Sequence, residues 1–230
     1  MKKTIIALAS LVSVATISAS RAQGIRLGLR AGANYSNLAG DVKNESTYNN
    51  KIGFLGGVML NAPLVGDGFL SVQPEILFSQ KGFENKPTEY KNLLGTTQKR
   101  EGQVNYNYLD VPVLFKVNAS GLVFELGPQY SYLLSIKDET RVTTTSGLTG
   151  NTSSSTTHNQ KNLDQLNRNE LGYVAGLGYQ AENGLSLNLR YTGAFSDFVK
   201  SDNDTYFDGD LKNARNSALQ VSLGYLLPAK

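Results

Sequence analysis

Apolar and polar residues alternate one by one along most of this chain, and that period constrains the fold more than any other feature of the sequence. In the stretch 25–35 the odd positions are apolar or Tyr, while the even positions are Arg, Gly or Asn. In the stretch 185–192 leucine or tyrosine alternates with Ser, Asn, Arg and Thr. A period of two is typical of β-strands with one apolar and one polar face, because successive side chains point to opposite faces.

The alternation recurs in eight stretches, which predict an all-β, eight-stranded antiparallel up-and-down barrel. The predicted strands are 25–35, 51–62, 69–83, 104–117, 122–134, 169–180, 185–196 and 217–227. Long connections alternate with short ones, and the long ones are 36–50, 84–103, 135–168 and 197–216. Such alternation is expected of a transmembrane barrel with long loops on the extracellular rim and short turns on the periplasmic rim.

The third long connection, 135–168, is rich in Ser and Thr. Burial of apolar surface is needed to offset the conformational entropy that a segment loses on ordering, and a segment of this composition has little apolar surface to bury. We therefore expect a mobile external loop there.

The alternation fits both a membrane barrel and a soluble lipocalin-like barrel, which differ in the face that points outward. In the predicted strands every charged residue falls on the polar face, and these are Arg26, Arg30, Lys51, Glu75, Lys81, Asp110, Lys116, Glu125, Glu170 and Arg190. A charge facing lipid at the bilayer midplane costs about 2–4 kcal/mol. An apolar face without charges therefore favours a transmembrane barrel, with outer-membrane lipid as its partner.

Aromatic residues of the apolar face fall near the two ends of the predicted strands. The group near the long connections is Tyr35, Phe54, Phe78, Tyr132, Tyr173 and Phe195, and the group near the short turns is Phe115, Phe124, Tyr179 and Tyr225. They are predicted to form two girdles at the level of the lipid headgroups. The alternative is that aromatic residues are simply common in strands.

The first 22 residues have the organisation of a secretory signal peptide. Lys2 and Lys3 precede an apolar run from Ile5 to Ile17, and small residues follow it. The run is shorter than the roughly 20 residues of a spanning helix. We predict cleavage after Ala22, with cleavage after Ala19 as the alternative, and a barrel domain over 23–230.

Composition excludes several kinds of site. The chain contains no Cys, so a thiolate metal site, a disulfide scaffold and a lipid-modified N-terminal cysteine are excluded. Removal of residues 1–22 takes away three basic residues and no acidic one, which leaves equal numbers of each. We therefore predict no nucleic-acid partner, and we predict neither a cofactor nor a metal ion.

Two predicted strands contain specific proline motifs: Gln73-Pro74-Glu75 in the stretch 70–82, and Leu109-Asp110-Val111-Pro112 in the stretch 108–116. These stretches resemble the third and fourth strands of the PorT-like outer-membrane β-barrel family of Bacteroidota. Stretches 125–134 and 175–179 fit the fifth and sixth strands. The resemblance spans nearly all of the mature chain and implies a bacterial outer-membrane barrel without assigned catalytic residues.

The inward charges are the candidate site. An eight-stranded barrel is just filled by its own side chains, and buried charges need partners. We predict a charge network in the lumen that includes Arg26, Arg30, Glu75, Lys81, Asp110, Lys116, Glu125, Glu170 and Arg190. The favoured role is structural, and a proton relay or a ligand site is the alternative.

The predicted function is a structural or surface-interaction role for a monomeric barrel that is not an enzyme. Candidate loop residues for contact with a surface partner are Tyr48, Tyr90, Tyr206 and Phe207, and the alternative is that such loop tips are simply variable. A role in secretion or envelope assembly, as in the member that gives the PorT-like family its name, is the alternative. A lipid-acyl enzyme would need an activating base, and the only His is His158, in the Ser/Thr-rich connection. A diffusion porin is disfavoured because eight strands leave no aqueous channel.

The mature protein is expected to fractionate with the outer membrane and to migrate differently on a gel before and after heating. A closed ring of strands resists detergent until heat opens it, and the opened chain migrates as an unfolded polypeptide. Recovery of the protein in the soluble periplasmic fraction would contradict the barrel assignment.

Overall fold

The computed structural model describes residues 24–41, 48–65, 68–91, 95–147, 149–156, 163–200, 211 and 213–228. Its regular elements are the strands β1 (Arg26–Asp41), β2 (Tyr48–Pro63), β3 (Leu70–Lys91), β4 (Thr97–Ala119), β5 (Leu122–Asp138), β6 (Arg141–Thr145), β7 (Thr152–Thr156), β8 (Asn169–Gln180), β9 (Leu185–Ala194) and β10 (Asn213–Leu226). Among the described residues, no helix is long and apolar enough to cross a membrane.

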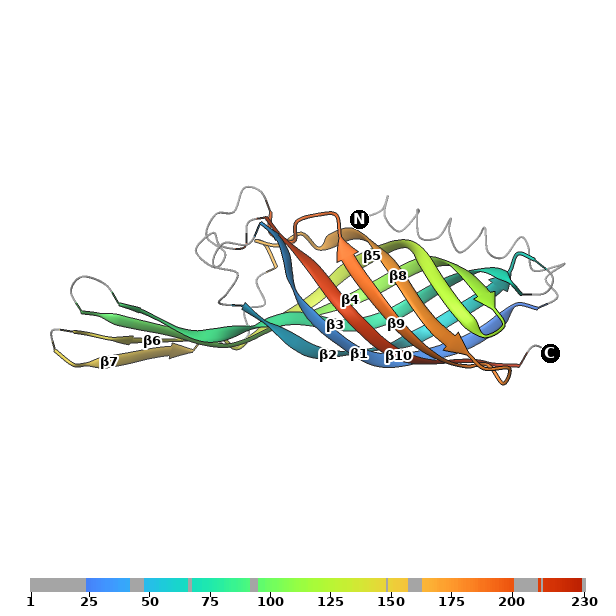
Figure 1. Cartoon of the computed structure of the whole chain (residues 1–230). Coiled ribbons are helices and arrows are strands. Elements are labelled where there is room, and N and C mark those ends of the chain that lie inside the picture. Colours follow the sequence, from blue (N-terminus) through green and yellow to red (C-terminus); the bar gives the residue numbers. More distant parts are fainter. Residues whose placement is uncertain are drawn as a thin grey trace.

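Eight of these strands form a closed antiparallel ring, which confirms the predicted all-β barrel (Figure 1). The strand order around the ring is β1, β2, β3, β4, β5, β8, β9 and β10, and pairing of β10 with β1 closes it. Every neighbouring pair is antiparallel, so consecutive strands run up and down. Strands β6 and β7 continue the same sheet outside the ring.

The apolar face of the ring points outward. Leu187 is 54% exposed, whereas the next residue, Asn188, is 1% exposed. The other large outward side chains of the ring strands follow the same rule, as Leu29, Phe54, Ile76, Phe124, Leu171 and Val221 do. Water would disfavour such a surface, and hydrocarbon favours it. This distribution overturns the alternative of a soluble lipocalin-like barrel, in which the apolar face would be inside.

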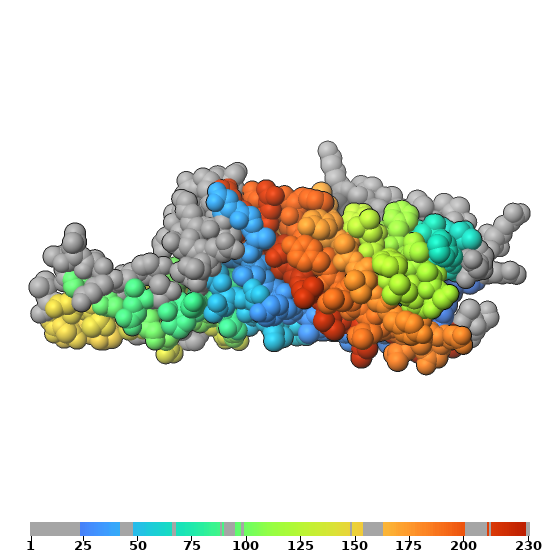
Figure 2. All heavy atoms as spheres, in the orientation of Figure 1, coloured from blue at the N-terminus to red at the C-terminus, as the bar shows by residue number. Residues whose placement is uncertain are grey.

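Strands β3 and β4 extend well beyond the predicted spans at the end of the long connections. β3 continues to Lys91 and β4 begins at Thr97, so the two remain paired from the barrel out to Lys91 and Thr97. Beyond the ring this hairpin lies next to β6 and β7, and together the four strands form a narrow sheet that projects from the barrel (Figures 1 and 2). We call this sheet, described over residues 86–91, 95–101, 141–147 and 149–156, the arm.

The prediction of a structureless loop over 135–168 is wrong for much of that segment. β5 continues to Asp138, and β6 and β7 form a hairpin within the Ser/Thr-rich sequence. The physical reason is that β4 offers an open edge beyond the barrel. β5 pairs with β4 up to Val104↔Asp138, and β6 continues the pairing with β4 in the same register from Glu101↔Arg141. His158 lies outside the described residues.

Tyr48 is not the exposed contact residue that the sequence predicted. β2 begins at Tyr48, and the Tyr48 ring is buried edge-on against Phe83, with 5.1 Å between the ring centroids. The strand starts earlier than expected, and the register shift between Asn50 and Leu55 interrupts its two-residue period. Tyr48 is therefore buried, although the even-numbered Ile52 and Phe54 of the same strand point outward. The side chain of Tyr90, residues Tyr206 and Phe207, and the predicted signal peptide 1–22 lie outside the described part of the chain.

A pair of matched substitutions tests which face meets lipid. The chain contains no Trp, so Leu187→Trp and Leu77→Trp each introduce a single fluorophore, the first outward and the second inward, where Leu77 is 1% exposed. In vesicles containing brominated phospholipid, Trp at 187 should be quenched and Trp at 77 should not, because only the first contacts acyl chains.

Overpacking at position 77 costs typically about 1–3 kcal/mol, so Tyr106→Trp, at another fully buried position, serves as a second inward probe. Quenching of the inward probes together with protection of Trp at 187 would contradict the orientation of the barrel wall.

Candidate functional site

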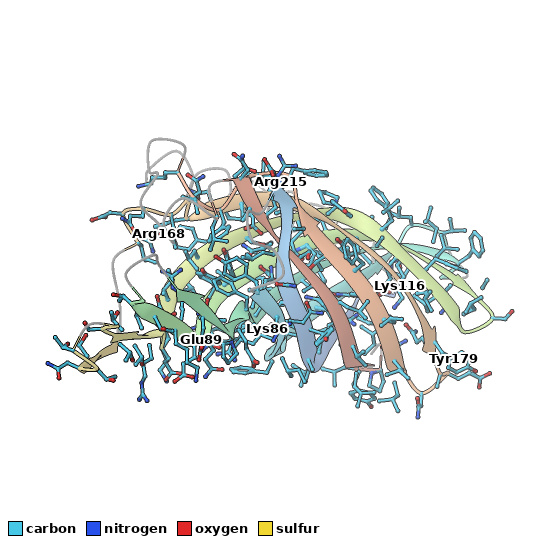
Figure 3. All side chains as sticks on the ribbon, turned by 60° about the vertical axis from the view of Figure 1, so that its left-hand side comes forward. Lys86, Glu89, Lys116, Arg168, Tyr179 and Arg215 are labelled. Carbon is cyan, nitrogen blue, oxygen red and sulfur yellow. The ribbon has the colours of Figure 1, made fainter. Side chains whose placement is uncertain are left out.

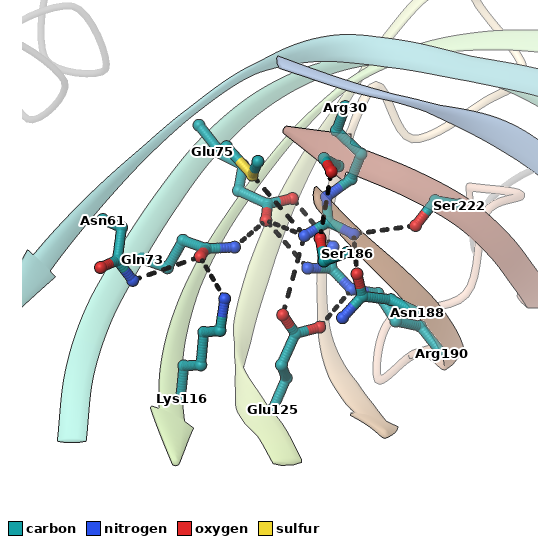
Figure 4. Close-up of polar contacts among 12 residues, drawn as sticks. Arg30, Asn61, Gln73, Glu75, Lys116, Glu125, Ser186, Asn188, Arg190 and Ser222 are labelled. Atoms are coloured by element: carbon teal, nitrogen blue, oxygen red, sulfur yellow. Dashed lines mark hydrogen bonds and ion pairs between the residues drawn. The ribbon is translucent and has the colours of Figure 1, made fainter. Parts of the chain in front are cut away.

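Two arginines and two glutamates meet inside the barrel, in the half nearer the short turns. Arg30 comes from β1, Glu75 from β3, Glu125 from β5 and Arg190 from β9 (Figure 4). Each lies at an inward position of the two-residue period, and their side chains are at most 1% exposed. We call these four residues the central ion-pair network.

Arg190 is the hub of this network. Its Nη1 and Nη2 donate to Oε2 and Oε1 of Glu75, both at 2.8 Å, while its Nε donates to Oε2 of Glu125 at 2.7 Å. Arg30 approaches from the other side, with its Nη2 3.2 Å from Oε1 of Glu75 and 3.7 Å from Oε1 of Glu125. The fork of a guanidinium matches a carboxylate in this two-bond geometry, which fixes direction as well as distance.

Neutral polar groups extend the network to the remaining strands. Arg30 donates to Ser222 Oγ at 2.8 Å and to Asn188 Oδ1 at 3.2 Å. Gln73 donates to Glu75 at 2.6 Å, and its own Oε1 accepts from Lys116 at 3.2 Å. The connected residues from β1 to β10 in ring order are Arg30, Asn61, Gln73 with Glu75, Lys116, Glu125, Gln180, Arg190 with Asn188, and Ser222. All eight strands of the ring are thus linked through side chains across the lumen.

Glycine makes room for the hub. A Cβ at Gly176 would lie 2.8 Å from Cγ of Arg190 and 3.0 Å from the carbonyl oxygen of Leu189. Gly176 faces Arg190 across the β8–β9 pair. A larger residue at position 176 would push the side chain of Arg190 away from both carboxylates. The position of Arg190 therefore depends on glycine at 176.

A second polar cluster lies nearer the long connections. Lys81 pairs with Asp110 at 3.0 Å and lies over the ring of Tyr108, 4.9 Å from its centroid. Asn216 donates to Tyr108 Oη at 2.9 Å and to Glu170 Oε2 at 2.6 Å. These side chains are buried. Lys81 and Asp110 pair with each other, and Glu170 accepts a hydrogen bond from Asn216, so this cluster is separate from the central ion-pair network.

The nine residues of the predicted lumen network therefore fall into separate groups. Arg30, Glu75, Glu125 and Arg190 meet directly, and Lys116 joins them through Gln73. Lys81, Asp110 and Glu170 belong to the second cluster. Arg26 lies at the rim with the short turns, where its guanidinium binds the carbonyl oxygens of Leu226 and Leu227 at 2.8 and 2.9 Å. Residues that share a face but lie at different heights along the barrel cannot all touch.

An apolar cluster closes the barrel interior at the end of the long connections, and the sequence analysis missed it. Its buried members are Leu38, Tyr48, Phe83, Val104, Tyr106, Tyr108, Leu133, Ile136, Leu166, Phe198, Val199, Leu211 and Ala214. Phe198 packs edge-on against Tyr106 with 5.5 Å between ring centroids. Phe198 and Leu166 come from connections between strands, and their segments are joined by a bridge between Leu166 and Val199. We call this set the mouth cluster.

The chemistry of these side chains is that of mutual neutralisation. In the central ion-pair network each carboxylate lies within 4 Å of both guanidinium groups. Burying such charges is costly unless they are paired and hydrogen-bonded. All four charges are paired here, while Nε of Arg30 and Oε1 of Glu125 are buried without a hydrogen-bond partner. Among the residues that the structure describes, no three His, Cys, Asp or Glu side chains gather as a metal-binding group.

Comparison with known proteins gives a family and a set of solved structures. Residues 18–200 match the family described as outer membrane protein β-barrel domain. No curated protein matches the chain. Neisserial surface protein A is 13% identical, with 88% of this chain and 99% of that chain covered at a TM-score of 0.45. Ail, the attachment invasion locus protein of Yersinia pestis, is 14% identical, with 88% and 98% covered at 0.41. A major outer membrane protein from Thermus thermophilus is 14% identical, with 89% and 100% covered at 0.42.

Removal of the hub should destabilise the barrel strongly. Arg190→Met leaves Glu75 and Glu125 facing each other with Arg30 alone, and breaking a buried ion pair in this way costs about 3–5 kcal/mol. The double variant Arg190→Met with Glu75→Gln should lose less than the sum of the two single variants, because neither partner is left alone. Urea unfolding in lipid vesicles measures these differences.

The matched control is Arg215→Met. Arg215 also pairs with a carboxylate, Asp197 at 2.8 Å, but both side chains are more than one third exposed. An exposed pair contributes about 0–1 kcal/mol. Equal urea midpoints for the Arg190 and Arg215 variants would contradict a stabilising role for the central ion-pair network.

Proposed function

This chain belongs to the outer membrane protein β-barrel domain family, and from this premise we propose that it is a closed membrane anchor that displays the arm at the cell surface. The barrel lies in the outer membrane, with lipid against its apolar outer face. The arm is the observation that carries the proposal, because a paired four-stranded sheet outside the ring contributes nothing to closing the barrel. Its exposed position suits contact with a surface partner.

The orientation of the barrel follows from the lengths of its connections. The short turns join β2 to β3, β4 to β5 and β8 to β9, and β1 begins and β10 ends at the same rim. In bacterial outer-membrane barrels the short turns face the periplasm and the long connections face outside. This supports an extracellular position for the arm and the mouth cluster. The basic start and the apolar run of residues 1–22 support a cleaved signal peptide that directs export.

The interior of the barrel favours an anchor over a channel. Arg190, Met59, Leu77 and Leu114 are each at most 2% exposed, although they point into the lumen from four different strands. The mouth cluster adds an apolar layer above the two polar clusters. An eight-stranded ring has room for its own side chains and little else. Neither a catalytic role nor a cofactor is part of the proposed function.

The arm is organised for exposure to water. Lys99 lies opposite Glu89 on β3, and Glu101 lies opposite Arg141 on β6. Lys99 also pairs with Glu101 at 2.9 Å, and this hydrogen bond lowers the pKa of the Glu101 carboxyl. Figure 3 shows Lys86 and Glu89 on the arm and Tyr179 near the opposite end of the molecule. Alternating charges keep such a sheet soluble and hold its strands in one register.

A narrower family assignment is also proposed. The segments around Gln73-Pro74-Glu75 and Leu109-Asp110-Val111-Pro112 resemble the PorT-like barrels of Bacteroidota, and this supports placing the chain near them. Glu75 and Asp110 of these segments are the acidic partners of Arg190 and Lys81. The motifs therefore coincide with residues that hold the barrel interior together, and the barrel itself is proposed to be monomeric in the membrane.

Cysteine labelling in intact cells tests the display of the arm. The chain contains no Cys, so Thr149→Cys at the tip of the β6–β7 hairpin and Glu182→Cys in a short turn each provide one exposed thiol. A membrane-impermeant maleimide should label position 149 in intact cells and position 182 only after the outer membrane is opened.

Single-channel recording of the purified protein in a planar bilayer provides the second measurement, and we expect no stepwise conductance. Labelling of position 182 but not 149 in intact cells would invert the proposed topology. Stable conductance steps would replace the anchor with a pore.

A further inference from the structure

The arm has two outer edges, and they differ in how they are protected. One edge is the end of β3. Asn85 is the last residue of β3 that pairs with β2, and residues 86–91 extend past it. The other is β7, the last strand of the described sheet, whose one partner among the described residues is β6. A strand edge presents a row of backbone N–H and C=O groups that can pair with another strand. Both edges are therefore chemically able to accept a further strand.

The β3 edge carries the features by which proteins prevent such pairing. Residues 86–91 include Lys86, Pro87, Glu89 and Lys91. Charged side chains and proline on an edge strand disfavour docking of a second strand. β7 has the sequence Thr-Ser-Ser-Ser-Thr, without charge and without proline. The arm is thus blocked on one side and open on the other.

The composition of β7 indicates which strand it would accept. It has no charge to select an oppositely charged peptide and no apolar side chain to bury in a pocket. Cross-strand pairs of Thr with Thr or Ser are favourable in antiparallel sheets, and β7 itself supplies such residues at every position. A second β7 meets both requirements, since it is uncharged and supplies Thr or Ser at each paired position.

We propose that β7 pairs antiparallel with β7 of a second copy of this chain, so that two arms form one continuous sheet. In the symmetric register Ser154 lies opposite Ser154, and Thr152 lies opposite Thr156. The contact is isologous, since the same residues are contributed by both copies. This inference rests on the proposed function, which places the arm outside the cell.

The direction of the arm determines where the second copy is. In two views the arm continues past the end of the barrel away from the short turns (Figures 1 and 3). Antiparallel pairing needs a two-fold axis across the strands, which reverses the direction of the arm and puts the two barrels at opposite ends of the assembly. Barrels inserted in one membrane share one direction. The two copies therefore belong to facing membranes, and the contact joins one cell to another.

A charge exchange at position 154 tests the pairing. Two populations of cells, stained differently, display either Ser154→Lys or Ser154→Glu in the full-length chain. Each population alone should lose the clumping of wild-type cells, because like charges lie opposite each other. Mixing the two populations should restore clumping, and the clumps should contain both stains. Many weak contacts act together between two cell surfaces, so a small change in the affinity of each β7 pair produces a large change in clumping.

The matched control is Thr143→Lys and Thr143→Glu. Thr143 lies directly opposite Ser154 but in β6, which has partners on both sides. These variants should clump alone and when mixed. Thr149→Cys is added to every variant and labelled from outside the cell, which measures how many arms are displayed. Failure of display would overturn the proposed function. Display without pairing would overturn only the present inference. If wild-type arms are displayed but the cells do not clump, the pairing of β7 with itself is overturned, even where the arms bind an added extended peptide. The pairing is also overturned if mixing the Lys and Glu populations does not restore clumping.

Discussion

Closure of the hydrogen-bonded ring is the constraint on which the rest of this structure depends. In hydrocarbon no water is present to satisfy a free backbone group, so a membrane-spanning sheet must have no edge. Pairing of β10 with β1 removes the last edge. The outer face can then carry only apolar side chains. Polar side chains are confined to the lumen, where the narrow ring forces them together. The ion pairs of the interior are thus a consequence of closure as well as a support for it.

The interior is organised in levels that link strands far apart in the sequence. Arg190 and Glu75 are separated by 115 residues and joined by two hydrogen bonds. Lys81 and Asp110 form a separate pair closer to the long connections, and the mouth cluster lies at that end. A buried ion pair is weak support for stability in itself, but removal of one partner is strongly destabilising. The levels therefore specify which strands belong together.

The sequence predicted the eight ring strands and their faces because lipid imposes the same two-residue period on each of them. It did not predict contacts within the lumen. Arg26 and Arg30 share a face, yet four residues of strand separate them by about 13 Å, and only Arg30 reaches the carboxylates. The arm was missed because β6 and β7 are almost entirely polar, with Val142 as their one apolar residue, so the two-residue period disappears outside the membrane. The sequence did contain an indication of the mouth cluster. Tyr106 and Tyr108 are spaced by two residues from Asp110 and therefore lie on the same inward face, where they are aromatic rather than polar or small.

Connections between strands usually vary in length without consequence for the fold. Here two of them return into the barrel: Leu166 and Phe198 are fully buried, and Asn167 donates a backbone hydrogen bond to Phe198. These segments evolve under the constraints of a protein core, where a change of one residue shifts packed side chains. At the tip of the arm, Thr149, Gly150 and Asn151 are exposed to solvent. Insertions, deletions and engineered epitopes are therefore compatible with the arm's tip and incompatible with the segments that fill the mouth.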